Sequence, residues 1–124
     1  MRVGYAIAPA DVIQRMRPYT TNASGVNVLA KFAAAASLKD TAGQADIRRK
    51  TIALRNSTSK ELEAWGYPVI PSQTNFFMVS LHDKTVQPTI QAFREKNILV
   101  GRPFPPMLNH LRVSIGRDED MAKF

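Results

Sequence analysis

The apolar positions in the first part of the chain predict a strand followed by two helices. Over residues 2–8, large apolar side chains recur at every second position with small residues between them, which is typical of a strand. Pro9 then begins a short helix that ends before Pro18. A second, alanine-rich helix is predicted from about Gly25. Its small side chains favour close packing against neighbouring elements on several sides.

A long amphipathic helix is predicted next, over residues 41–65. It has a sparse apolar stripe, and the charged residues between the stripe positions, Arg55 among them, are expected to face solvent. Gly66 is the predicted end of this helix. The stripe consists of Ile47, Leu54, Leu62 and Trp65.

Three further stretches have the pattern of strands. Residues 74–81 place apolar side chains on both faces, which predicts a strand buried on both sides within an α/β layer. The sequence "ILVG" at 98–101 predicts a short buried strand, and "LRVSIG" at 111–116 predicts another.

The remaining segments predict two helices and a stiff loop. Thr85 can cap a helix that tolerates Pro88 in its first turn and ends at Asn97. Residues 102–110 form a proline-stiffened loop, and the acidic residues 118–120 suit the first turn of a last helix. We therefore expect an α/β fold, a mixed sheet with helices packed on it. The opening strand and the short last helix lead us to expect a domain truncated at both ends.

Composition limits the classes of function. At 124 residues the chain has the length of one domain, and it has no cysteine for a disulfide or thiolate metal site. His82 and His110 are its only histidines, so we predict no metal site. There is no run of about 20 apolar residues and no signal-peptide pattern, so we expect a cytoplasmic protein without membrane contact.

The net charge of +7 permits an anionic partner, but the basic residues are scattered along the sequence. We therefore interpret them as solvated helix faces and expect no nucleic-acid partner. Other short matches are read as structural or accidental. They are a Ser-x-x-Lys pattern at 57–60 and glycosylation sequons at Asn22 and Asn56. No catalytic set of residues is identified.

Two predicted strands share a pattern that suits anion binding. In "RVGYA", Arg2 and Gly4 fall on one face, and in "RVSIG", Arg112 and Ser114 fall on one face. Small neighbours leave room beside an arginine, and a guanidinium binds carboxylate or phosphate through two parallel hydrogen bonds. Arg102, in the proline loop, lies ten residues before Arg112. The alternative for the two strand arginines, Arg2 and Arg112, is that each pairs with an aspartate or glutamate of the chain.

These stretches resemble one family in order along the chain. "MRVGYAIAPADVI" resembles the segment after the Schiff-base lysine of fold-type-I pyridoxal-phosphate-dependent aminotransferases (class I/II). "PSQTNFFMV" and "ILVGRPFPPMLNHLRVSIG" are similar to the C-terminal part of the histidinol-phosphate aminotransferase group. The resemblance covers essentially all of the chain.

The resemblance implies roles for the three arginines. Arg2 matches the arginine that binds the phosphate of pyridoxal 5'-phosphate, and Arg112 matches the one that binds the substrate's carboxylate or phosphate. Arg102 resembles a second substrate-anion arginine. The Schiff-base lysine would fall before residue 1, and no lysine of the chain matches its motif. Met1 is therefore expected to be an interior residue of a longer enzyme.

The resemblance also implies an organisation and a reaction. Residues 1–8 would be a strand of the large cofactor domain, 9–40 interdomain helices, and 41–124 the C-terminal small domain of the aminotransferase fold. The intact enzyme would bind pyridoxal phosphate, act as a homo-oligomer and transfer an amino group to 2-oxoglutarate, as in histidine biosynthesis. The donor would be a small amino acid or amino phosphate, its identity left open.

The chain alone is expected to be inactive and not to bind the cofactor. Two other hypotheses stay open at this point. One is a free-standing, non-enzymatic module that binds anions or a protein partner. The other is a basic nucleic-acid binder, which would show strongly salt-dependent association.

Overall fold

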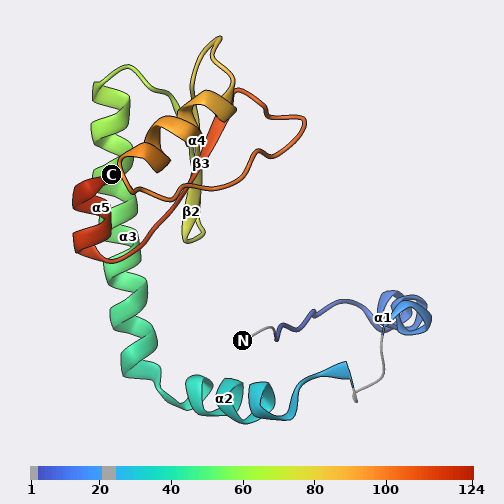
Figure 1. Ribbon diagram of the computed structural model, residues 1–124. Coiled ribbons are helices and arrows are strands. Elements are labelled where there is room, and N and C mark those ends of the chain that lie inside the picture. The colour runs from blue at the N-terminus through green and yellow to red at the C-terminus, as the bar shows by residue number, and fades with distance from the viewer. Residues whose placement is uncertain (1–2, 21–24) are drawn as a thin grey trace. The chain divides into compact units, whose positions relative to one another are not determined.

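The computed structural model describes residues 3–20 and 25–124, which divide into two compact units. The first unit ends at Ala45, and the second comprises Asp46–Phe124. Helix α3 (Thr41–Ala64) contributes residues to both (Figure 1). The boundary lies near the predicted start of a small domain, although the assignment of each stretch to a domain of a larger enzyme stays a prediction.

The first unit contains the two predicted helices. These are α1 (Ala10–Met16), followed by a 3₁₀ turn at Arg17–Tyr19, and α2 (Val28–Lys39) (Figure 1). The N-cap residue of α2 is Asn27, whose side-chain oxygen accepts a hydrogen bond from the Ala30 amide at 3.2 Å. That bond satisfies one of the free amides at the start of the helix and fixes where it begins.

Two expectations for this unit are wrong. The described residues before α1 form no strand, and Tyr5 and Ile7 are 85% and 88% exposed. A strand needs a hydrogen-bonded neighbour, and no described segment pairs with this one. In α2, Ala30 is buried but Phe32 is exposed, so the helix is not enclosed on several sides. Arg2, the predicted cofactor residue, lies outside the described residues.

The ends of α3 agree with the sequence to within a residue. Asp40 accepts a hydrogen bond from the Gly43 amide at 2.9 Å, which caps the helix start. At the other end Gly66 has a φ of +84°, and the Tyr67 amide donates to the Leu62 carbonyl at 2.9 Å. The left-handed conformation favours glycine, so Gly66 ends the helix as predicted.

The described sheet has three strands in the order β1–β2–β3. They are β1 (Val69–Ile70), β2 (Phe76–Ser80) and β3 (His110–Ser114), and both pairs are antiparallel. Helices combined with a sheet confirm the α/β fold class, but the sheet is antiparallel rather than mixed. The loop that joins β1 to β2 is too short for the crossover that a parallel pair requires.

The core lies on one face of this sheet. Phe77 pairs with Val113 and Val79 with Leu111, and all four side chains are at least 97% buried. Helix α3 adds Leu62, and α4 (Val86–Glu95) adds Val86. On the other face of β2, Phe76 and Met78 are only half-buried. The expected burial of β2 on both faces is therefore wrong for this chain.

Two other details of the second unit differ from the sequence analysis. Residues 98–101 form no strand, because the contact with β3 is limited to a long 3.4 Å hydrogen bond from the Gly101 amide to the Arg112 carbonyl. Arg55 is 92% buried instead of facing solvent. Its guanidinium donates to the Thr74 carbonyl at 2.9 Å and so ties α3 to the loop before β2. In the predicted stripe, Ile47 and Trp65 are exposed.

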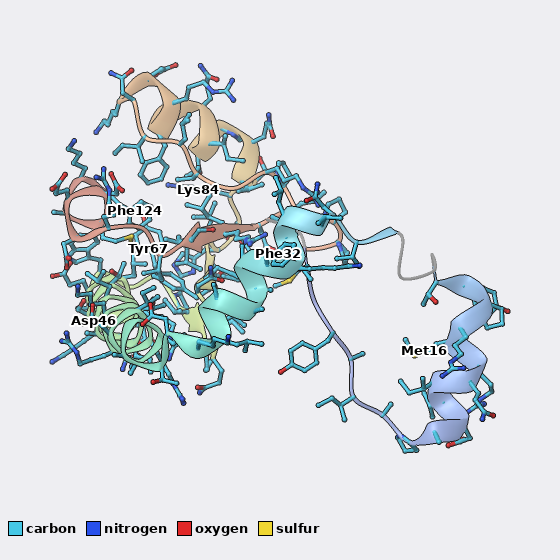
Figure 2. All side chains as sticks on the ribbon, turned by 90° about the horizontal axis from the view of Figure 1, so that it is seen from below. Met16, Phe32, Asp46, Tyr67, Lys84 and Phe124 are labelled. Atoms are coloured by element: carbon cyan, nitrogen blue, oxygen red, sulfur yellow. The ribbon has the colours of Figure 1, made fainter. Side chains whose placement is uncertain are left out.

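The C-terminal segment packs on α4. Helix α5 (Asp118–Lys123) begins with the three predicted acidic residues, and Phe124 follows it. Figure 2 labels Phe124 at the end of the chain. The Phe124 ring stacks on Phe93 of α4, with ring centroids 5.2 Å apart and planes 13° from parallel. This contact extends the core beyond the sheet.

We expect Leu111→Ala to lower the free energy of unfolding by about 2–5 kcal/mol, because it removes a side chain from the centre of the packed face. Chemical denaturation followed by circular dichroism measures the change. Leu99→Ala is the matched control, since Leu99 is 85% exposed and should change stability by less than about 0.5 kcal/mol. Equal losses in the two variants would contradict this account of the core.

Candidate functional site

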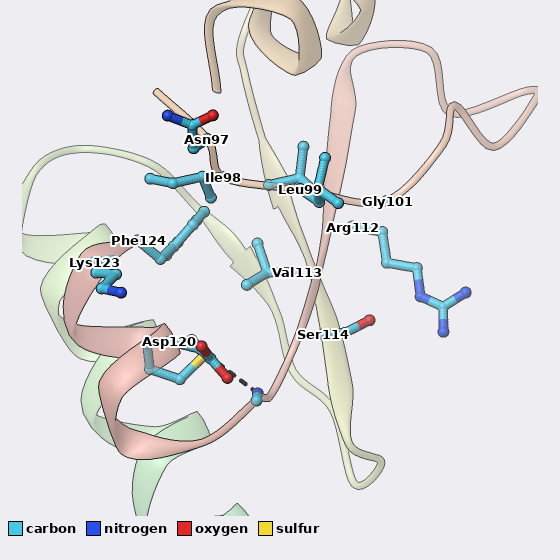
Figure 3. A pocket seen from close by; sticks show the side chains of 13 residues that line it. Asn97, Ile98, Leu99, Gly101, Arg112, Val113, Ser114, Asp120, Lys123 and Phe124 are labelled. Atoms are coloured by element: carbon cyan, nitrogen blue, oxygen red, sulfur yellow. Dashed lines mark hydrogen bonds between the residues drawn. The ribbon is translucent and has the colours of Figure 1, made fainter. Parts of the chain in front are cut away.

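Arg112 lies in the middle of β3, on the face opposite the core. Its neighbours Leu111 and Val113 point into the core, so the alternation of the strand turns Arg112 to the other side. Figure 3 shows Arg112 and Ser114 on one side of β3 and Val113 on the other. This is the placement that the sequence predicted for Arg112 and Ser114.

The guanidinium of Arg112 rests on an aromatic ring rather than on an acid. Its Cζ lies 4.0 Å from the centroid of the Phe76 ring, a distance at which the ring face attracts a cation. The Nε atom is buried and has no hydrogen-bond partner among the described residues. A buried donor without an acceptor is costly, and such groups in native proteins often serve a function.

The described carboxylates that form ion pairs are paired with other cations. Asp11 pairs with Arg15, Asp46 with Lys50 and Arg49, and Asp120 with Arg117. Lys50 and Arg49 hold the pKa of Asp46 below its usual value, and Arg117 does the same to the pKa of Asp120. Within the described residues, no salt bridge involves Arg102 or Arg112. For Arg112, the alternative that it pairs with an acid of the chain is therefore wrong.

The structure brings Arg102 and Arg112 together through one ring. The Cζ of Arg102 lies 4.3 Å from the centroid of Phe104, and the Cζ of Arg112 lies 5.2 Å from the same centroid. Arg102 is exposed, and its guanidinium donates a hydrogen bond to the neighbouring Pro103 carbonyl at 3.2 Å. Two guanidinium groups without acidic partners thus share one aromatic side chain.

A groove of about 560 Å³ lies beside this site but is chemically different from it. Residues 97–101, the end of β3 and α5 line it, with Ile98, Leu99 and Phe124 providing apolar surface (Figure 3). Arg112 borders the groove, but its guanidinium extends away from Phe124 (Figure 3). The anion-binding candidate is therefore the arginine face of β3, and the groove is a separate hollow.

The predicted contact of Arg2 with pyridoxal phosphate stays a prediction. Arg2 lies outside the described residues, and the lysines lie on helices, in turns or near the chain end, as the sequence indicates. Groups of three or more potential metal ligands are absent from residues 3–20 and 25–124. In the same ranges, no helix combines the length and apolarity needed to cross a membrane. The candidate site among the described residues is therefore the pair Arg102 and Arg112, whose chemistry suits an anion.

Sequence reasoning missed the residues that support the arginines. The sequence pattern places Phe76 and Gly101 in strands and Phe104 in the proline-stiffened loop, and it gives none of them a role beside an arginine. A Cβ added to Gly101 would lie 3.1 Å from the Arg112 Cβ, so the glycine allows the loop to approach β3. The sequence feature that could have indicated this contact is Phe104, an aromatic residue two positions after Arg102.

Comparisons with known proteins identify the family of this chain. The family model for aminotransferase class I and II matches residues 1–124. A histidinol-phosphate aminotransferase of Marinomonas sp. is 37% identical over 98% of this chain and 36% of its own length. The Clostridium acetobutylicum enzyme of the same name is 34% identical over 100% of this chain and 36% of its own. The chain thus spans about a third of the length of these curated relatives.

Two solved aminotransferase structures have a fold similar to that of this chain. A provisionally named histidinol-phosphate aminotransferase from Erwinia carotovora atroseptica is 30% identical, with a TM-score of 0.67 over 72% of this chain and 25% of that one. A provisionally named aminotransferase from Burkholderia pseudomallei is 28% identical, with a TM-score of 0.75 over 93% of this chain and 35% of that one. Together with the family model, these likenesses show that the chain belongs to the class I and II aminotransferases.

Proposed function

We propose that this chain provides the substrate-anion arginines of an aminotransferase similar to the histidinol-phosphate aminotransferases. The observation that carries the proposal is Arg112, a guanidinium fixed on the Phe76 ring with a buried, unpartnered Nε and no acidic partner among the described residues. Its substrates would be small amino acids or amino phosphates that carry a carboxylate or phosphate. The amino acceptor would be 2-oxoglutarate.

The geometry suits a planar anion. Stacking on Phe76 fixes the plane of the guanidinium, and the terminal nitrogens form no hydrogen bond with the described residues. A carboxylate can therefore accept two parallel hydrogen bonds from a group whose orientation is already set. Because the arginine is half-buried, a bound carboxylate would be less screened by water than on an open surface.

Pyridoxal phosphate, when bound to the intact enzyme, supplies the electron sink for amino transfer. The proposed part of this chain is to hold the substrate by its anionic group, with Arg112 as the strand-borne anchor and Arg102 as a second cation. Arg2 is proposed to bind the cofactor phosphate. No lysine in the sequence matches the Schiff-base motif, so we propose that the 124-residue chain alone does not catalyse transfer.

We expect Arg112→Gln to weaken binding of succinate to the chain by about tenfold or more, because a charged bidentate partner is lost. Titration followed by nuclear magnetic resonance measures the affinity. Arg94→Gln is the matched control, since Arg94 is an exposed arginine on α4 and should bind succinate as the original chain does. Equal affinity in all three proteins would contradict the assignment of Arg112.

The chain mixed with pyridoxal phosphate, glutamate and imidazole-acetol phosphate is expected to show no amino transfer above that of free cofactor. Coupled detection of 2-oxoglutarate measures this, with a full-length histidinol-phosphate aminotransferase as the positive control. Turnover by the chain, together with a visible absorbance band of protein-bound cofactor, would show that the catalytic group is present in these 124 residues.

We also propose that the chain associates with itself. The proposal is supported by apolar side chains exposed outside the core, of which Tyr5, Ile7 and Tyr19 are at least 85% exposed in the first unit. We expect sedimentation velocity to show dimers or larger species whose fraction rises with concentration. A single monomer boundary at high concentration would contradict this. The cytoplasmic location stays a prediction.

A further inference from the structure

We propose that Phe104 is a positioning residue that holds Arg102 and Arg112 together as one anion-binding unit. The proposal rests on the proposed function, because it deals with how the substrate-anion arginines are held. Its basis is the shared ring, with the Cζ atoms of Arg102 and Arg112 at 4.3 Å and 5.2 Å from one centroid. Both distances lie within the range of cation–π attraction.

The Phe104 ring offsets the repulsion between the two guanidinium groups. Two guanidinium groups near each other repel, and neither has an acidic partner among the described residues. The negative face of an aromatic ring attracts each cation without forming an ion pair that a substrate would have to break. Phe104 can therefore keep the two arginines close while leaving their charge available to a ligand.

Backbone contacts fix the ring relative to β3. The Met107 amide donates to the Phe104 carbonyl at 2.8 Å, which closes a turn at the tip of the loop. Before Phe104 in the chain, the Gly101 amide donates a 3.4 Å hydrogen bond to the Arg112 carbonyl. A side chain at Gly101 would crowd Arg112. Gly101 thus holds the start of the loop to the strand that carries Arg112, and the turn from Phe104 to Met107 closes the loop on itself.

Phe104→Leu removes the ring, and Phe104→Tyr keeps it. In the full 124-residue chain labelled with ¹⁵N, we expect Phe104→Leu to weaken binding of succinate and of inorganic phosphate about tenfold. Phe104→Tyr should bind both within about twofold of the original chain. Phe32→Leu is the matched control, because Phe32 is an exposed phenylalanine of α2 and its loss should leave both affinities unchanged.

The arginine side-chain resonances provide a readout that a merely structural role would not move. The Nε–Hε signals of Arg102 and Arg112 should shift in Phe104→Leu and stay near their original positions in Phe104→Tyr, while amide signals far from the loop stay fixed in both. In the original chain, the Phe104 ring protons should show nuclear Overhauser effects to the Hδ protons of both arginines. That measurement does not depend on whether a variant folds.

The outcomes separate the two proposals. If Phe104→Leu binds both probes as the original chain does, or if ring contacts to either arginine are missing, the positioning role is overturned and the function of Arg112 stands. If the original chain binds neither probe, the anion-binding function fails, and the arginine resonances of the two Phe104 variants still decide whether the ring positions them.

Discussion

The register between β2 and β3 is the constraint on which both the core and the arginine site depend. Pairing Phe77 with Val113 and Val79 with Leu111 gathers four large side chains on one face. Because strand side chains alternate, the same pairing turns Arg112 to the other face, opposite Met78 and next to Phe76. A shift of one residue would bury Arg112 and expose Leu111 and Val113. The free energy gained by packing the core therefore also fixes the orientation of the arginine.

The chain stabilises Arg112 in a way that suits a binding group. An acidic neighbour would satisfy its charge, but a substrate carboxylate would then have to displace that neighbour. An aromatic face offers a smaller attraction, on the order of 0.5–2 kcal/mol. The Phe76 ring therefore orients the guanidinium without neutralising it, and the buried Nε is left without an acceptor among the described residues. Such a group is suited to holding an anion in a fixed direction, as the proposed function requires.

Local patterns predicted what short-range chemistry decides, and failed where distant contacts decide. Helix α3 begins after a cap at Asp40 and ends at the left-handed Gly66, the stop signal that the sequence analysis identifies. The period of two along β3 was enough to place Arg112 beside Ser114. Residues 3–8 have the same period, yet form no strand because no described segment pairs with them. The burial of Arg55 depends on the carbonyl of Thr74, 19 residues away, which no local pattern contains.

Different contacts fix the positions of the two arginines. This difference explains why the strand pattern placed Arg112 but no local pattern placed Arg102. Arg112 lies on a paired strand whose position the core determines. Arg102 lies on an exposed loop, and its hydrogen bond goes to the next residue, Pro103, which does not tie it to the rest of the fold. Its position relative to β3 therefore depends on the Phe104 ring and on the close approach of Gly101 to Arg112. In the proposed site, the strand would set where an anion is held, and the loop would set how far the second cation reaches toward it.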